Sequence, residues 1–408
     1  MEQIEVYKEL QIKLLAMTGK EEIDDIKEFI EKNGLLNGKS KSLATIRLIA
    51  SVAYSHIKLL RNAIILVNLL GKIEVKKKLT SYINHEEIRN REKVINLLLR
   101  ANGQKLDEDY ISILLNEYEK MLTSGNPSLL KALLDDNVES LQSYISKNNY
   151  DLNQTIPYSY YDQNYPILVS AKAIDYAALF GSINCFKFLI MNMEDLYYQG
   201  LLNSSIAGGN HEIIHIVENK IQCQNSIDYN QLLEIAILFM QNDLIDYIIE
   251  KSDIKIESEN YIKCIYSSNY EAILKLRKLD DSDSINYYGE IGSTPIDIAA
   301  FEDYLDFFKF FLSIKGIQYK KLNNYGKTIL QSAVRGNSLD IVKYIDRKHL
   351  INFNYEGTFG MSPFMIAARF NIVDILKYYK MRSIWKKKRK FRKPRNSNNR
   401  FYYRYTKE

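Results

Sequence analysis

Apolar residues recur at three- and four-residue steps through most of this 408-residue chain, the spacing of helices with one buried face. In the first third this pattern predicts four helices, over Ile4–Ala16, Glu21–Glu31, Leu43–Leu70 and Asp107–Leu122. The turn-forming run Ser124-Gly125-Asn126-Pro127 follows them. We therefore expect residues 1–123 to form a helical N-terminal region, acting either as a cap or as an oligomerisation element.

Between Gly292 and Tyr379 the pattern becomes periodic, because one 34-residue unit occurs three times. Four kinds of position keep this step: the glycines Gly292, Gly326 and Gly360, the hydroxyls Thr294, Thr328 and Ser362, the small residues Ala299, Ala333 and Ala367, and the cations Lys309, Lys343 and Lys377. A fixed period in this range indicates supersecondary units that stack on one another.

Each shared residue has a physical role in such a unit. The glycine begins a turn, where a positive φ costs it little. Thr or Ser caps the helix that follows, and Pro295 and Pro363 fit its first turn because their missing N–H has no partner there. The alanines let two antiparallel helices approach closely. One unit cannot bury its apolar face alone, so its neighbours must cover it.

These residues resemble the ankyrin repeat, in which a turn glycine precedes Thr-Pro-Leu-His, an alanine pair and Leu-Glu-Ile-Val-Lys. The histidine is replaced by Asp297, Gln331 and Met365, so its hydrogen bonding is not carried over. Degenerate units begin near Ser128, and Asp151–Ser170 reads as a loop insertion. The resemblance implies an all-α solenoid of about seven or eight helix pairs over residues 124–381. This order of a helical N-terminus, degenerate units and regular units is similar to a large group of protozoan ankyrin proteins, which look like binding proteins.

The resemblance also implies where a partner protein binds, namely on the concave face made by turn tips and inner helices. The candidate positions lie just before the turn glycine and just after the alanine pair: Tyr325, Phe359, Phe301, Arg335 and Arg369. Tyr325 and Phe359 are candidate anchors, and the arginines are candidate donors to carboxylates. All five also fit ordinary surface residues.

Charge is distributed unevenly, since the net charge of +5 combines a net −6 over residues 1–381 with a strongly basic C-terminal end. We expect residues 382–408 to be a disordered tail, because like charges at this density repel. Its basic cluster comprises Lys386, Lys387, Lys388, Arg389, Lys390, Arg392, Lys393 and Arg395. Such a cluster is typical of a nuclear import signal read by an importin, of a nucleic-acid contact, or of a solubilising tail without specific role. A nucleic-acid-associated nuclear factor is thus the alternative function.

Catalytic motifs are few. The segment His211-Glu212-Ile213-Ile214-His215 matches the H-E-x-x-H zinc pattern, and a zinc hydrolase is the remote alternative. The extended pattern needs Gly at 218 and His at 221, but Glu218 and Ile221 stand there. The repeat pattern explains the same residues as surface and packing positions. We therefore expect neither an enzyme nor a metal or other cofactor.

Cysteine usage and hydropathy limit the remaining classes. Cys185, Cys223 and Cys264 have no metal-ligand spacing and are interpreted as small buried residues. The most apolar stretch, Leu43–Leu70, is interrupted by charged residues, so no membrane span is expected. Without a signal sequence at its N-terminus, the protein is expected to be intracellular, either cytoplasmic or nuclear.

Overall fold

The computed structural model describes residues 2–70, 73, 86–102, 104, 108–122, 127–156, 171–193, 196, 198–221, 227–280, 283–356 and 360–392, with side chains left out at 86–92, 108, 117–122, 198, 221 and 383–392. Within these ranges the chain forms 22 α-helices and two short 3-10 helices, and no strand occurs among them. The all-α fold predicted from the sequence is confirmed.

Six helices make up the N-terminal region: α1 (Glu2–Leu15), α2 (Lys20–Lys32), α3 (Lys39–Ser55), α4 (Leu60–Leu69), α5 (Glu86–Ala101) and α6 (Glu108–Leu122). The prediction of a single helix over Leu43–Leu70 is wrong, because two helices cover this stretch. Helix α3 ends at Ser55, His56 leaves the helical conformation, and the 3-10 helix Ile57–Leu59 leads into α4. The spacing of apolar residues continues across this break, so the sequence pattern does not reveal the break.

The remaining described helices form eight consecutive pairs. In each pair a first helix is followed by an antiparallel second helix: α7 (Pro127–Leu134) with α8 (Val138–Asn148), α9 (Ala173–Leu179) with α10 (Ile183–Met191), α11 (Tyr198–Gly208) with α12 (His211–Ile221), α13 (Tyr229–Leu238) with α14 (Asn242–Ser252), α15 (Ser258–Ser267) with α16 (Tyr270–Leu279), α17 (Pro295–Phe301) with α18 (Leu305–Ser313), α19 (Ile329–Arg335) with α20 (Leu339–Lys348), and α21 (Pro363–Arg369) with α22 (Val373–Arg392). Each first helix contacts the first helix of the next pair, which produces a continuous array.

The turn inside every pair contains one residue with left-handed backbone. These residues are Asp136, Gly181, Gly209, Met240, Ser268, Asp303, Asn337 and Asn371, with φ between 52° and 68°. Left-handed residues commonly end helices because they direct the last N–H groups back to the free carbonyls. The early units thus keep the same turn geometry as the regular ones, although their sequences have diverged.

A polar residue directly after that turn often links one pair to the preceding one. Its side chain donates a hydrogen bond to a backbone carbonyl at the end of the preceding first helix or in the turn after it: Ser182 to Leu133 at 2.5 Å, Asn210 to Gly181 at 3.1 Å, Gln241 to Ala207 at 2.9 Å, Asn269 to Ile237 at 2.9 Å, and Ser338 to Phe301 at 3.2 Å. These bonds satisfy buried carbonyls and fix the spacing between units.

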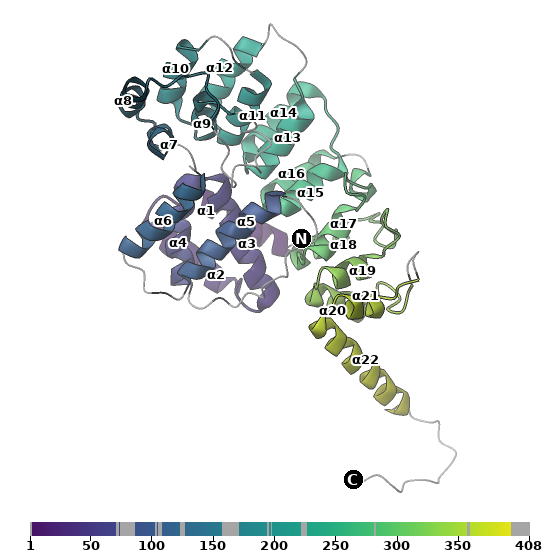
Figure 1. Ribbon diagram of the computed structural model, residues 1–408. Coiled ribbons are helices and arrows are strands. Elements are labelled where there is room, and N and C mark those ends of the chain that lie inside the picture. The colour runs from purple at the N-terminus through teal and green to yellow at the C-terminus, as the bar shows by residue number, and fades with distance from the viewer. Residues whose placement is uncertain are drawn as a thin grey trace, which may run out of the picture.

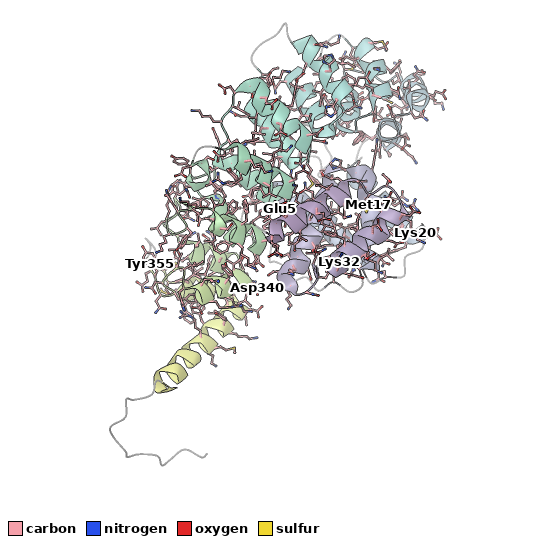
Figure 2. All side chains as sticks on the ribbon, turned by 180° about the vertical axis from the view of Figure 1, so that it is seen from behind. Glu5, Met17, Lys20, Lys32, Asp340 and Tyr355 are labelled. Atoms are coloured by element: carbon pink, nitrogen blue, oxygen red, sulfur yellow. The ribbon has the colours of Figure 1, made fainter. Side chains whose placement is uncertain are left out.

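The array bends around the N-terminal helices, which pack against its second helices (Figure 1). Helix α1 contacts α16 and α18, although these are separated from it by more than half of the chain. Figure 2 shows Glu5 where the N-terminal helices meet the array, whereas Lys20 lies at their far side. The N-terminal region is thus docked against the second helices of the array, and its expected role as a cap or an oligomerisation element stays a prediction.

Gln11 is the polar centre of this contact and is fully buried. Its side-chain oxygen accepts hydrogen bonds from the backbone N–H groups of Tyr270, at 2.8 Å, and Glu271, at 3.1 Å. Its amide nitrogen donates to Asn269 at 2.8 Å. Gln11 therefore satisfies free donors at the start of α16 from a different part of the chain.

Tyr270, which bonds to Gln11, also belongs to an aromatic stack. The Tyr7 ring stacks on Tyr270 with centroids 4.8 Å apart, and Tyr270 stacks on Phe307 at 4.6 Å. Tyr304 meets the edge of Phe307, and the guanidinium of Arg47 lies 4.1 Å from the Tyr304 ring centroid. Further along, Ser40 donates a hydrogen bond of 2.5 Å to Asp340, which Figure 2 places on the side of the array facing these helices. Helices α1 and α3 thus contribute to the same core as the repeats.

The C-terminal helix α22 extends further than the sequence predicts. Its backbone is helical to Arg392, so part of the segment expected to be disordered continues the helix of the last pair. Extending an existing helix avoids the cost of nucleating a new one. Arg382, where the tail was expected to begin, belongs to the array: its Nε lies 2.8 Å from Asp346 and its guanidinium 4.0 Å from the Phe353 ring centroid. Lys393 and Arg395 lie outside the described residues.

Candidate functional site

The turns of the three regular units are built as the sequence predicts. Gly292, Gly326 and Gly360 have φ of 68°, 63° and 65°, a region open to glycine. Thr294, Thr328 and Ser362 are the N-cap residues of α17, α19 and α21, with Pro295 and Pro363 inside the first turn. The predicted side-chain cap is confirmed for Thr328 and Ser362, whose hydroxyls accept from the backbone N–H groups of Gln331 and Met365, whereas Thr294 makes no such bond.

Asp297 and Gln331 supply hydrogen bonds at the position of the family's histidine. The Asp297 carboxylate accepts a bond of 2.7 Å from the Thr294 hydroxyl. Gln331 accepts one of 2.8 Å from the Thr328 backbone N–H and donates one of 2.6 Å to the Met361 carbonyl in the next turn. Two of the three turns are therefore held by side-chain hydrogen bonds without a histidine.

Two adjacent hollows lie between these turns and the first helices. The first has a volume of about 260 Å³ and includes Asp297, Phe301, Tyr325, Lys327 and Arg335 in its lining. The second has about 500 Å³ and is lined by Tyr325, Gly326, Lys327, Gln331, Arg335, Met361, Ile366, Arg369 and Phe370. Tyr325, Lys327 and Arg335 border both, so the hollows form one surface across three repeats. We call it the first-helix surface.

Four of the five sequence-predicted binding residues lie on this surface. Tyr325 and Arg369 are exposed, and Arg335 is half-buried. Phe301 lines the first hollow but is only 9% exposed, which corrects the expectation that it is a surface residue: it is the last residue of α17, which α19 packs against. Phe359 lies outside the described residues.

The sequence interpretation missed Lys327 and Phe370. Both stand next to residues that the period does single out, Lys327 directly after the turn glycine Gly326 and Phe370 directly after Arg369. The 34-residue register therefore could have located them.

The H-E-x-x-H segment forms surface contacts with both neighbouring repeats. His211 lies 2.9 Å from Asp243 of the following pair, and Glu212 lies 2.5 Å from Lys187 of the preceding pair. His215 is 3.2 Å from Asn219 on the same helix. In the described parts of the chain, no group of three or more His, Cys, Asp or Glu residues is arranged to hold a metal ion. The three motif residues thus have separate partners.

The cysteines are consistent with packing residues. Cys185 and Cys264 are buried free thiols. Burial, together with the nearby Asp136, raises the pKa of Cys185 to about 12, which opposes formation of the reactive thiolate. Cys223 lies outside the described residues. Among the helices that the structure describes, none is both long and apolar enough to cross a bilayer.

Asp297 makes stability depend on pH. Burial raises the pKa of its carboxyl from 3.8 to about 6, despite the bonds from Thr294. A carboxyl with a raised folded-state pKa adds stability below its unfolded pKa, and this contribution is lost as pH rises through about 6. We expect the free energy of unfolding of the wild type to fall, relative to that of Asp297→Asn, by on the order of 2 kcal/mol from pH 4 to pH 7.

Urea unfolding of both proteins across this range measures that difference. The subtraction also removes the contribution of Asp175, whose pKa burial likewise raises to about 6. If the free energies of unfolding of the two proteins changed equally with pH, the prediction would be contradicted.

Comparison with known proteins agrees with this architecture. Residues 296–384 match the family described as ankyrin repeats (3 copies), a segment that begins in α17 and ends in α22. The protein therefore contains ankyrin repeats where the three 34-residue units predict them. A solved structure with similarity is the ankyrin repeat domain of human ASB11, which is 13% identical, with a TM-score of 0.27, over 58% of this chain and 90% of that one. A comparison with curated proteins gives no match.

Proposed function

We propose that the protein is a non-catalytic scaffold that binds a partner protein through the first-helix surface. The observation that carries this proposal is the pair of adjoining hollows, at which an exposed tyrosine stands beside arginines. Tyrosine and arginine are enriched among the residues that dominate protein interfaces. A ring buries a large area while losing few rotatable bonds. The layout of helical N-terminus and degenerate early repeats supports grouping it with the protozoan binding proteins of similar order.

Tyr325→Ala tests this proposal. Tyr325 is 51% exposed, so its removal should leave the fold intact. We expect the amount of partner recovered to fall about tenfold or more, the loss typical of an interface anchor. The measurement is a quantitative pull-down from nuclease-treated lysate of the native cell with the tagged full chain.

Tyr287→Ala is the matched control. Tyr287 is 61% exposed and does not line either hollow. Capture that survives Tyr325→Ala as well as Tyr287→Ala would place the partner elsewhere. A loss of equal size with both variants would indicate a nonspecific aromatic effect.

The basic cluster at residues 386–395 supports a second role, as an import signal or a polyanion contact that brings the protein to the nucleus. Changing its eight basic residues to glutamine is a cleaner test than cutting the chain at Met381. The cut would remove Arg382, which pairs with Asp346. Capture that collapses with these substitutions or with nuclease would favour the alternative function of a nucleic-acid-associated factor.

A further inference from the structure

The larger hollow of the first-helix surface combines apolar walls with a rim of cations. Tyr325, Met361, Ile366 and Phe370 form much of its wall. Lys327 of the turn, Arg335 at the end of α19 and Arg369 at the end of α21 bring three positive charges to its edge. Both guanidinium carbons lie close to one ring, Arg335 at 5.8 Å and Arg369 at 6.0 Å from the Phe370 centroid.

These cations have no acidic partner within the described ranges of the chain. Other cations of the repeats do form ion pairs there: Lys187, Lys251 and Lys275 on second helices, and Lys263 on the first helix α15. Neither Lys327 nor Arg335 nor Arg369 takes part in one. The Nε of Arg335 is buried without a hydrogen-bond partner. Burial and the charge of Arg335 both lower the pKa of Lys327, as expected for cations gathered without a counter-charge.

A buried or crowded cation without a partner is costly, and an anionic ligand would remove that cost. We propose that this hollow binds an acidic peptide segment of a partner protein, with a carboxylate among Lys327, Arg335 and Arg369 and a neighbouring aromatic or aliphatic side chain on the apolar wall. The inference rests on the proposed function and specifies the chemistry of the partner.

A peptide fits this hollow better than a nucleic acid does. Nucleic acids are bound along extended tracks of positive charge, because each phosphate contributes to the affinity. Here three cations converge on one hollow of about 500 Å³, in a body of residues 1–381 whose net charge is negative. One carboxylate beside one apolar side chain matches that arrangement.

The experiment is a selection of random phage-displayed peptides on the immobilised full chain, with the tail cluster changed to glutamine in every protein so that it cannot attract acidic peptides. We expect enriched sequences to place Asp or Glu next to Trp, Phe, Leu or Ile. Synthetic versions, measured by fluorescence anisotropy, should bind R335E/R369E at least tenfold more weakly and should lose affinity as salt is raised.

Two further variants make the result interpretable. R347E/K348E changes the charge equally at exposed positions of the second helix α20 and should bind like the parent. The single variant R369E alters only an exposed side chain, so a partial loss of binding with an unchanged melting curve excludes misfolding as the cause.

Other outcomes would overturn the inference in distinguishable ways. Enrichment of neutral or basic peptides that still depend on Tyr325 would refute the acidic ligand while supporting the first-helix surface. Peptides unaffected by Tyr325→Ala and by R335E/R369E would refute both. A selection without enrichment, or a labelled single-stranded RNA that binds the parent but not R335E/R369E, would also refute the acidic peptide.

Discussion

Replacing Tyr270 with alanine should destabilise the folded protein by about 3–5 kcal/mol, the usual cost of truncating a fully buried aromatic residue. The Tyr270 ring lies between Tyr7 of α1 and Phe307 of α18, in two stacked contacts. Its removal leaves a cavity where α1 meets α16 and α18, two helices of consecutive repeats more than half of the chain away. The loss should therefore appear as weakened docking of the N-terminal helices as well as a lower global stability.

Urea unfolding and hydrogen exchange together measure this effect. We expect the amides of α1 to lose protection, while those of α9–α12, far from the contact, lose less. Tyr270→Phe is the matched control, since it keeps the ring and removes only the hydroxyl that donates to Asp306. That change should cost about 1–3 kcal/mol by leaving a buried acceptor unsatisfied. Unchanged protection of α1 in Tyr270→Ala would show that the stack does not hold the N-terminal helices.

Gly336→Ala should destabilise the protein by about 2–3 kcal/mol, because α17 and α19 leave no space for a methyl group. A Cβ atom at Gly336 would lie 1.8 Å from the carbonyl oxygen of Phe301. The same oxygen accepts the hydrogen bond from Ser338. The two units must separate to relieve the clash, which weakens this bond and alters the hollow beneath Phe301 and Arg335.

Thermal or urea unfolding of Gly336→Ala measures the cost, and peptide binding reports on the hollow. Gly19→Ala is the control, since its Cβ would meet only the end of the Glu22 side chain, at 3.2 Å. Gly208→Ala repeats the test at an earlier unit, where the Ala178 oxygen would be 2.0 Å away. Stability equal to that of the wild type in both repeat variants would mean that the units adjust their spacing without loss.

The repeats were predictable because the residues that specify each unit lie within that unit. A turn glycine, a hydroxyl cap and an alanine pair act within one unit, and the 34-residue step presents each of them three times. The resemblance to the ankyrin repeat selected Tyr325, Arg335 and Arg369, which line the same hollow. It could not show that Phe301 is buried, since that depends on how closely the neighbouring unit packs.

The docking of the N-terminal helices could not be predicted. Gln11 reads as an ordinary polar residue of an amphipathic helix, yet it is fully buried and bonds to the start of α16. Nothing near residue 11 specifies a partner 258 positions away. Tyr7 does not reveal its stacking partner either, because any aromatic residue on the apolar side of α1 suggests local packing only.

That long-range contact bears on how the chain folds during synthesis. An ordinary solenoid can propagate unit by unit, since each unit contacts only its neighbours. Here α1 leaves the ribosome before the residues that bind Gln11, which follow 258 or more positions later. At translation rates of about 5–20 residues per second, α1 waits tens of seconds for α16. During that interval Tyr7 lacks the Tyr270 ring on which it stacks, so the newly made helix α1 is expected to need a chaperone or a temporary packing of its own.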